Sequence, residues 1–538
     1  MPSVPRRHMR HALTAGSWPR MAAGAAGLAC LVLILGAPFL VLPLATGSMP
    51  SLDVLADPYL LGVLRFTLMQ AALSALLSAL FGIPLALALH RTQFFGRHML
   101  LRLFLLPQAL PTLVAALGIL AVFGRSGLLS QGLAALGLPR LDIYGLSGIL
   151  LAHVFFNMPL AARIGFAALS AVPNESWKLA GQLSLGRAAT FRIVEWPAIR
   201  AVLPGILTLI FMLCVTSFAL VLVLGGGPAA TTLEVAIYQS LRYDFDPGRV
   251  IALSLTQIVV VALVLVPASL WTRSAPAMFS LGGRVQRYER PGRLARLCDI
   301  AVIALGLAFV LTPFAAILAN GLKADLAGLL MQASVHRAMV TSLVIALLAT
   351  VCGLALSMAL VFGAASRRLG ASAFTMAGSI VLVVPPVVVG AGWFLLLRDV
   401  GAVSRLAPVI VILANAVMAV PFMMRILKPA LDGAEATQRR LALQLGLSGM
   451  AYGRLVLWPV LRRPLGLAAA FGLALSLGDL GVVALFGSQD LVTLPYLLLQ
   501  RMGSYRTDDA AGLALILAAL CLVLMILAER GAGRTERG

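Results

Sequence analysis

The sequence predicts an all-α polytopic membrane protein with twelve transmembrane helices in two parallel six-helix repeats. Composition is the first observation: of 538 residues, 61% are hydrophobic and only 11% are charged, and the mean hydropathy is +0.99. Soluble domains carry roughly 25% charged residues, so an ordinary soluble protein is excluded. The second observation is a series of long apolar runs, and the third is a set of residues that recur at a fixed offset.

Twelve apolar runs are long enough to cross a bilayer. A spanning helix needs about 20 residues, because each adds about 1.5 Å to a hydrocarbon core about 30 Å thick. In chain order the runs are 22–45, 61–89, 101–123, 146–168, 201–224, 250–271, 300–320, 339–363, 374–397, 406–426, 464–486 and 510–528. The first run follows four arginines, as in a signal peptide, but it exceeds the roughly 7 to 15 apolar residues of such a peptide. We therefore expect an uncleaved first span.

Basic residues are distributed unevenly between the two sides of these spans. If the N-terminus is cytoplasmic, 30 of the 41 Lys and Arg fall in cytoplasmic segments and 11 fall outside. The net charge is then +22 inside and 0 outside, and Asp479 adds −1 within the eleventh span. Because Lys and Arg concentrate on the cytoplasmic side of membrane proteins, both termini are predicted to be cytoplasmic.

The two halves of the chain share residues at an offset of 262. PLAARI at 159–164 recurs as PFMMRI at 421–426, and the Trp-Pro pair at 196–197 recurs at 458–459. Six spans in each half would make both halves enter the membrane in the same direction, with a pathway between them. The predicted organisation is a tail at 1–21, a first repeat at 22–271, a linker at 272–299, a second repeat at 300–528 and a tail at 529–538.

The segments 171–200 and 427–463 are the most similar parts of the two repeats, and both are predicted to be cytoplasmic. Each predicts a short helix, a Gly/Ser break, a second amphipathic turn and a Trp-Pro stop. Because proline lacks an N–H and clashes with the preceding turn, this pair either ends the helix or starts the next one. A loop that only obeys the sidedness rule would not need matching Ala, Gln, Leu, Trp and Pro residues. We therefore predict that each segment docks onto another protein.

These segments resemble the EAA coupling loops of ABC importer permeases, in which a proline stands thirteen residues after a glycine. Ala180 and Ala442 occupy the third position of that motif and Gly446 occupies the glycine, whereas Ser184 replaces the glycine in the first half. Lys178 and Arg440 replace the opening glutamate. Longer runs resemble the fused permease subunit of the bacterial thiamine ABC importer: GILLAHVFFNMP at 148–159, VEWP at 194–197, LGGGPAATT at 224–232, SLGDLGVVALFG at 476–487 and GSYRTD at 503–508.

The resemblance implies a permease of the bacterial inner membrane that imports thiamine and its phosphate esters. It implies delivery by a periplasmic thiamine-binding protein and ATP hydrolysis on a separate ATPase dimer, so that this chain is not itself an enzyme. The residues expected to couple the chain to the ATPase are Lys178, Ala180, Ser184, Trp196, Pro197, Arg440, Ala442, Gly446, Trp458 and Pro459. The Trp residues can also serve as anchors at the membrane interface.

No cofactor, metal ion or nucleic-acid partner is expected for this chain. None of its three lysines follows a glycine, so the Gly-Lys-Ser/Thr core of a phosphate-binding loop is missing, and no H-E-x-x-H motif occurs. The basic stretch at 272–297 is expected to lie near anionic lipid.

Three polar residues inside the spans are candidates for the translocation path. Asp479 is the one carboxylate within a span, and such an acid usually faces a polar interior. It is interpreted either as a partner for the thiazolium cation or as a cap within the helix bundle, since Gly478 and Gly481 indicate a break. His153 and Asn157 lie four residues apart on one helix face, and they either join helices by hydrogen bonds or contact substrate.

Two alternatives remain open from the sequence. An iron(III) ABC permease shares the duplicated format. A secondary transporter with two parallel halves would need several ionisable residues within the membrane for ion coupling, and this chain offers essentially one. Such a transporter would also have no use for two matched docking segments.

Overall fold

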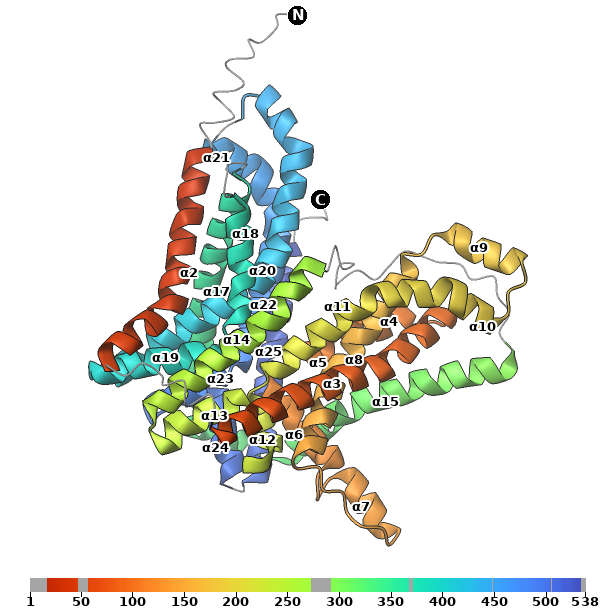
Figure 1. Ribbon diagram of the computed structural model, residues 1–538, viewed down its shortest axis with the longest axis horizontal. Coiled ribbons are helices and arrows are strands. Elements are labelled where there is room, and N and C mark those ends of the chain that lie inside the picture. The colour runs from red at the N-terminus through yellow and green to blue at the C-terminus, as the bar shows by residue number, and fades with distance from the viewer. Residues whose placement is uncertain are drawn as a thin grey trace, which may run out of the picture. The chain divides into compact units, whose positions relative to one another are not determined.

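The computed structural model describes residues 17–46, 57–271, 292–366, 371–447, 449–504 and 506–533 (Figure 1). All regular elements in these ranges are helices, which confirms the all-α fold class. Eleven helices there are long and apolar enough to cross a membrane. A bent pair, Ala371–Val383 and Pro386–Arg398, meets at 83° and raises the number to twelve if it is counted as one span. Each predicted apolar run overlaps one of these helices or the bent pair.

The chain forms two compact units that differ from the two predicted halves. Unit 1 comprises Met1–Val54, Ile237–Ile258 and Asp325–Gly538, and unit 2 comprises Leu55–Ala236 and Val259–Ala324. The first helix of each predicted half is therefore part of the unit formed mainly by the other half. We call these two helices, α2 (Ser17–Thr46) and α15 (Arg293–Lys323), the exchanged helices.

Unit 2 is built on four long helices, α3 (Pro58–Arg91), α8 (Leu146–Ser170), α11 (Trp196–Val215) and α15 (Figure 1). Helix α8 packs against α3 and α11, and α15 packs against α3. The shorter elements of this unit are α4 (Arg97–Leu103), α5 (Leu106–Ala109), α6 (Thr112–Phe123), α7 (Leu128–Ala135), α9 (Asn174–Gln182), α10 (Arg187–Thr190), η2 (Phe191–Glu195), α12 (Ala219–Leu224) and η3 (Pro228–Ala230). Helices α13 (Leu233–Gln239) and α14 (Pro247–Trp271) cross from one unit into the other.

Unit 1 has its own bundle of long helices, in which α17 (Ala333–Ala364), α20 (Val403–Gln444) and α22 (Trp458–Gly478) pack against one another. Helix α25 (Thr507–Gly533) packs on α22, and the exchanged helix α2 packs on α17. The remaining elements are η4 (Ser240–Asp244), α16 (Leu326–Met331), α18 (Ala371–Ile380), η5 (Val381–Val383), α19 (Pro386–Asp399), α21 (Gly449–Tyr452), η6 (Gly453–Leu457), α23 (Gly481–Phe486) and α24 (Leu494–Gly503).

Small residues let both exchanged helices approach their units closely. A Cβ atom built on Gly24 of α2 would lie 2.6 Å from the Cα of Gly363 in α17, so the two backbones cross where neither residue has a side chain. In unit 2, a Cβ on Gly118 of α6 would lie 2.7 Å from the Ile317 side chain of α15. Close approach at small residues is how helices pack in a membrane, where water does not drive association. Each exchanged helix is thus an integral part of its unit.

Four of the predicted spans are broken by turns. The third run, 101–123, is divided among α4, α5 and α6, and the ninth is the bent pair in which Pro385 precedes α19. The fifth and eleventh runs break at Thr216–Phe218 and at Asp479–Leu480. Proline removes a donor and clashes with the preceding turn, which explains the breaks beside Pro111 and Pro385. Hydrophobic composition alone predicted each of these four runs as one continuous helix.

The described part of the predicted linker is its last segment, 292–299. Helix α15 begins at Arg293, so the last residues of the predicted segment 272–299 are already helical. Residues 272–291 lie outside the described residues.

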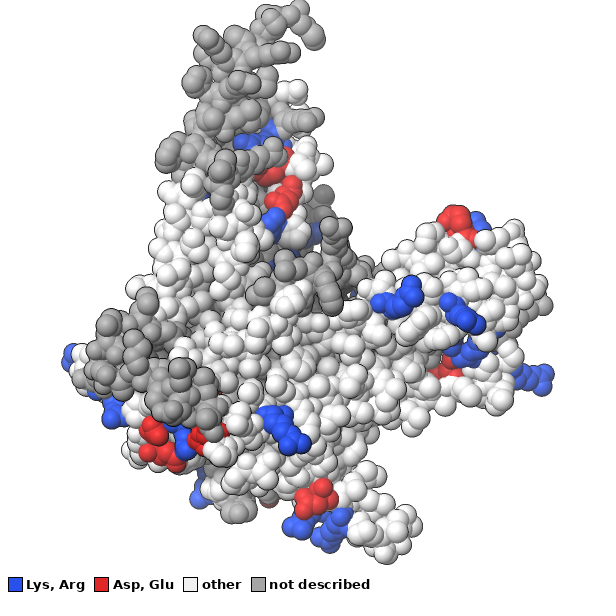
Figure 2. All heavy atoms as spheres, viewed as in Figure 1, with Lys and Arg blue, Asp and Glu red and all other residues white. Residues whose placement is uncertain are grey.

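Charged side chains are sparse on the visible faces of the long helices (Figure 2). Exposed leucines occur there instead, for example Leu80 on α3, Leu305 on α15 and Leu347 on α17. A helix that is apolar all round and still exposes leucines suits a hydrocarbon environment and not water.

Candidate functional site

The first coupling segment, α9 to η2, is an amphipathic helix followed by a short turn and a second helical stretch. In α9, Trp177 and Ala180 are buried three residues apart on one face, and Lys178 is exposed on the other. The Trp177 ring lies 5.2 Å from the His90 ring at the end of α3, and His90 in turn contacts Phe166 of α8. The buried face therefore fixes α9 to the ends of two long helices of unit 2.

Both coupling segments contain the same left-handed turn. Ser184 has φ of +49° and Gly446 has φ of +69°, at positions separated by the repeat offset. The residue that follows donates back to the buried alanine: Leu185 N–H to the Ala180 carbonyl at 3.0 Å, and Leu447 N–H to the Ala442 carbonyl at 2.9 Å. This is a Schellman ending, in which a residue with positive φ closes a helix. This ending explains two positions of the motif: the alanine carbonyl accepts the closing hydrogen bond, and the glycine position adopts the positive φ.

Each turn follows an exposed ridge of two leucines. Leu179 of α9 and Leu183, which directly follows α9, are 55% and 62% exposed. Their counterparts at the repeat offset, Leu441 of α20 and Leu445 directly after α20, are 57% and 66% exposed. Residues four apart lie on one helix face, so each pair forms a continuous apolar surface beside the buried alanine. The side chain of Arg440 lies outside the described residues.

The Trp-Pro pairs begin helices, which is the second of the two outcomes that the sequence left open. Trp196 and Pro197 are the first two residues of α11, and Trp458 and Pro459 are the first two of α22. Each helix follows directly from a five-residue π-helical turn, η2 or η6. Proline is tolerated at a helix start because the N–H that it lacks would have no helical partner there. Both tryptophans are exposed, as an interface anchor would be.

The two coupling segments are less alike than the sequence indicates. In the first, residues 171–173 separate α8 from α9. In the second, α20 runs without interruption for 42 residues from the predicted tenth span through the coupling segment, with Pro421 and Pro429 inside it. Only the first segment is therefore a separate helical knob, and the prediction of two such knobs is wrong for the second.

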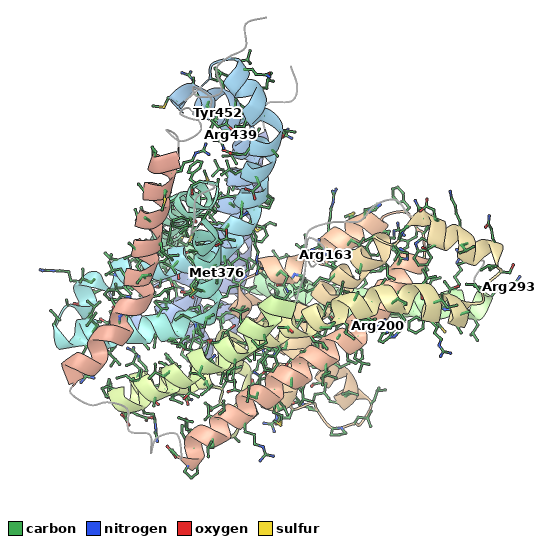
Figure 3. All side chains as sticks on the ribbon, turned by 45° about the horizontal axis from the view of Figure 1, so that its top comes forward. Arg163, Arg200, Arg293, Met376, Arg439 and Tyr452 are labelled. Carbon is green, nitrogen blue, oxygen red and sulfur yellow. The ribbon has the colours of Figure 1, made fainter. Side chains whose placement is uncertain are left out.

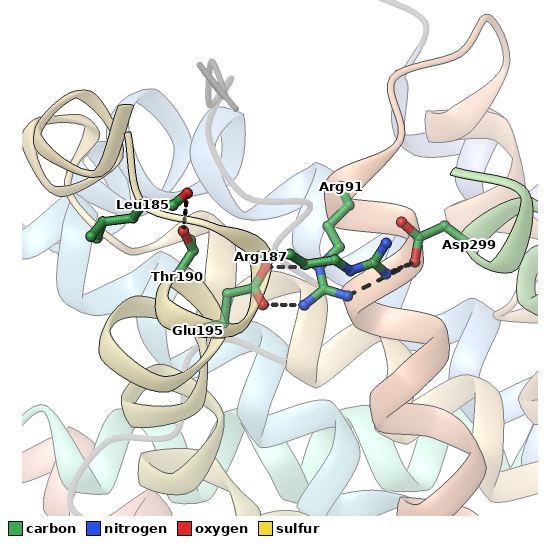
Figure 4. Close-up of polar contacts among 6 residues, drawn as sticks. All are labelled: Arg91, Leu185, Arg187, Thr190, Glu195 and Asp299. Atoms are coloured by element: carbon green, nitrogen blue, oxygen red, sulfur yellow. Dashed lines mark hydrogen bonds and ion pairs between the residues drawn. The ribbon is translucent and has the colours of Figure 1, made fainter. Parts of the chain in front are cut away.

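An ionic cluster holds the first coupling segment in place (Figure 4). Arg91, at the end of α3, donates from Nε to Glu195 Oε1 at 3.0 Å and from Nη2 to Glu195 Oε2. Arg187 of α10 donates to Asp299 Oδ1 of α15 at 2.5 Å, and Arg91 Nη1 lies 3.8 Å from the same oxygen. Glu195 is 1% exposed and Asp299 is 5% exposed. Paired donors of this kind offset the cost of removing a carboxylate from water.

A second ionic cluster belongs to unit 1. Glu435 of α20, which is 6% exposed, accepts from Arg20 Nη1 of α2 at 2.6 Å and from Arg439 Nη1 at 2.8 Å. Arg439 lies beside Tyr452 of α21 (Figure 3). The guanidinium of Arg20 also lies 6.0 Å from the centre of the Phe362 ring of α17.

His153 and Asn157 lie together in a buried polar cluster of unit 2. His153 Nδ1 is 2.9 Å from Ser74 Oγ of α3, and Asn157 Nδ2 is 3.5 Å from Cys214 Sγ of α11. Gln70 of α3 donates to the Cys214 carbonyl at 3.0 Å. The two candidates thus join three helices by hydrogen bonds, which is the structural interpretation of their spacing.

Asp479 lies in unit 1 at the break between α22 and α23. Its Oδ1 accepts from the Gly481 N–H at 3.0 Å, so the side chain caps the start of α23. Its Oδ2 is buried without a hydrogen-bond partner among the described residues. Nearby, Asn415 Nδ2 donates to Ser476 Oγ at 3.0 Å, and these two residues are the repeat counterparts of His153 and Cys214. The capping interpretation of Asp479 is thus the one that its contact with Gly481 supports.

Sequence reasoning missed Trp177 and the two ionic clusters. The spacing of Trp177 and Ala180 would have indicated a buried face on α9. Glu195, Asp299 and Glu435 stand near span ends, where a charge also satisfies the sidedness rule, so their pairing over long sequence separations left no local pattern. Within the described ranges, no three His, Cys, Asp or Glu side chains approach closely enough to hold a metal ion.

Comparisons with known proteins bear on the whole chain. No protein-family model matches it. It is 51% identical over 516 residues to the thiamine transport system permease protein ThiP of Brucella abortus (strain 2308), with 95% of each chain covered. The protein of the same name from Escherichia coli (strain K12) is 43% identical over 488 residues, 89% of this chain and 91% of that one.

A more distant match supports the same class. The probable sulfate transport system permease protein cysT of Helicosporidium sp. subsp. Simulium jonesii is 33% identical over 208 residues, which cover 38% of this chain and 75% of that protein. The matches to the thiamine permeases confirm the resemblance that the motifs indicated. The chain belongs to the family of thiamine transport system permease proteins.

Proposed function

We propose that this chain is the membrane-spanning subunit of an ATP-driven importer that carries thiamine and its phosphate esters into the bacterial cytoplasm. A periplasmic thiamine-binding protein delivers the cargo, and a separate ATPase dimer hydrolyses ATP. The chain lies in the inner membrane with both termini in the cytoplasm, in contact with anionic lipid along its basic segments. The family membership supports this assignment, and the iron(III) permease and secondary transporter are not favoured by the relatives that match.

The matched coupling segments are the observation that carries the proposal. Each presents two exposed leucines, one in the last turn of a helix and one directly after it, beside a buried alanine. An exposed apolar ridge outside the hydrocarbon core is unfavourable unless a partner covers it. A groove on each ATPase subunit would cover one ridge. ATP-driven closure of the ATPase dimer would then move the two segments and the helices attached to them.

Docking through the leucine ridges is tested by Leu183→Asp and Leu445→Asp. Both side chains are exposed, so the substitutions should leave the fold unchanged, whereas a charge in the groove should prevent the ATPase subunits from co-purifying with the chain. Leu136→Asp is the matched control, because Leu136 is 76% exposed and lies beyond α7, outside both segments. Normal ATPase co-purification with both ridge variants would contradict docking at these leucines.

A further inference from the structure

The exchanged helices share one feature: each is joined by an ion pair with a buried carboxylate to the coupling segment of the unit in which it lies. In unit 2, Asp299 of α15 accepts from Arg187 of α10 at 2.5 Å. In unit 1, Arg20 of α2 donates to Glu435 in the coupling segment of α20 at 2.6 Å. We call these two ion pairs the helix ties.

The helix ties are built from residues that do not correspond in the two repeats. At the repeat offset, Arg187 corresponds to Gly449 and Glu435 corresponds to Pro173. The signs are also reversed: the coupling segment supplies the cation in unit 2 and the anion in unit 1. Duplication of an ancestral pair therefore does not account for them. The same connection is made twice by different chemistry.

Burial distinguishes the helix ties from ordinary surface ion pairs. Asp299 and Glu435 are 5% and 6% exposed, whereas the Arg125–Asp142 pair beside α7 has side chains that are 73% and 55% exposed. Exposed pairs contribute little, because water and salt screen them. A charge–charge contact in a poorly solvated site resists separation much more strongly. Each carboxylate also has a second arginine nearby, Arg91 for Asp299 and Arg439 for Glu435.

We propose that the helix ties make each coupling segment and its exchanged helix move as one body, so that Arg20 and Asp299 are positioning residues for transport. The proposal rests on the proposed function, since it takes the ATPase to act on the coupling segments. Without the tie, only packing along the helix would transmit movement of the coupling segment to the exchanged helix. The coupling segment could then move while the exchanged helix stays in place. With the tie intact, displacement of α10 carries α15 with it, and displacement of the α20 end carries α2. ATP hydrolysis is then converted into movement of a whole unit.

Two single substitutions remove the ties without leaving an unpaired buried charge. In Arg20→Gln, Glu435 keeps Arg439. In Asp299→Asn, Arg91 keeps its paired bonds to Glu195, and Arg187, whose side chain is 36% exposed, can turn to water. Arg20→Lys and Asp299→Glu retain the charges and serve as conservative variants. Arg125→Gln is the matched control, because it removes an arginine from an exposed ion pair away from both coupling segments.

The test uses the full chain with its ATPase subunits in lipid vesicles, with the thiamine-binding protein outside, and measures thiamine taken up per ATP hydrolysed. Arg20→Gln and Asp299→Asn should assemble with the ATPase and hydrolyse ATP, but the thiamine carried per ATP should fall about fivefold or more below the wild type, in the range of typical coupling effects. The conservative variants should restore most of the yield, and Arg125→Gln should match the wild type. An unchanged yield in the two assembled tie variants would overturn the proposal. Absence of ATP-driven uptake by the wild type would instead overturn the proposed function.

A distance measurement tests the rigid connection directly and does not depend on how well the variants transport. Spin labels at Ala188 of α10 and Leu297 of α15, both exposed, report the separation of the coupling segment and the exchanged helix. In the otherwise wild-type complex this separation should be the same with and without ATP bound, and in Asp299→Asn it should change or broaden. A separation that changes with ATP while the tie is intact would contradict movement as one body.

Discussion

Ser184 and Gly446 show how single residues shape the coupling segments. Both have positive φ, a conformation in which a Cβ atom meets the following carbonyl and which glycine adopts freely. The first repeat therefore contains a residue that is unfavourable in its own turn. The departure from the family's glycine at position 184 changes the local conformational energy but not the turn, because the Schellman bond to Ala180 forms as it does at Ala442.

Exchange of the two residues gives opposite effects on stability. Ser184→Gly should stabilise the folded chain by about 1 kcal/mol, and Gly446→Ser should destabilise it by about the same amount. Neither side chain would meet another group, since both positions are exposed. Thermal unfolding of the purified protein in detergent measures the two shifts. Shifts of the same sign would show that the backbone conformation is not the cause.

Asp479 combines a capping contact to the Gly481 N–H with a negative charge at the break between α22 and α23. Asn retains the oxygen that accepts from the Gly481 N–H, so Asp479→Asn should fold and assemble normally. It removes the negative charge that would face the thiazolium cation, and we expect thiamine uptake to fall about tenfold or more, as for the loss of one charged contact. Asp479→Ala loses both the charge and the capping oxygen, so it should be less stable than Asp479→Asn. The difference in stability between the two variants reports the capping role alone. Unchanged uptake by Asp479→Asn would remove the acid from the transport path.

At the scale of elements, Trp177 is the anchor of α9. The side chain is 1% exposed and packs against His90, and truncation of a buried tryptophan costs about 3 to 5 kcal/mol. We expect Trp177→Ala to detach α9 from the helix ends and to speed hydrogen exchange of backbone amides in Asn174–Gln182, with little change in α8. Trp458→Ala is the control, because Trp458 is 60% exposed. Equal exchange rates in α9 of the Trp177 variant and the wild type would show that other contacts hold the helix.

Hydrophobicity predicts where the helices are but not how they are interrupted. Runs of about 20 apolar residues identify the spans because the hydrocarbon thickness sets their length. The turns beside Pro111 and Pro385 are visible in the sequence once proline is given priority over composition. The continuous α20 is different: Pro421 and Pro429 both favour an interruption, and the helix nevertheless continues through them. Packing of α20 against α17 and α22 accompanies this continuity.

At the scale of the whole molecule, the sequence repeat predicts two similar halves, whereas the compact units exchange their first helices. Periodicity and offset say which residues correspond, but they do not say which bundle a helix joins. The contacts that place α2 and α15 are a close approach at Gly24 and Gly363, a contact at Gly118 and Ile317, and the helix ties. All of them join residues that are far apart in the chain. The coupling positions could be predicted because they recur in both repeats. The helix ties could not be predicted, because their residues do not recur.

We expect this chain to carry thiamine only as part of an ATP-driven assembly. Thiamine uptake into lipid vesicles containing the chain tests this requirement most directly, with and without the ATPase subunits, the thiamine-binding protein and ATP. We predict that thiamine accumulates only when all three are present and that removal of any one abolishes accumulation. Accumulation without ATP, or by the chain alone, would contradict the account.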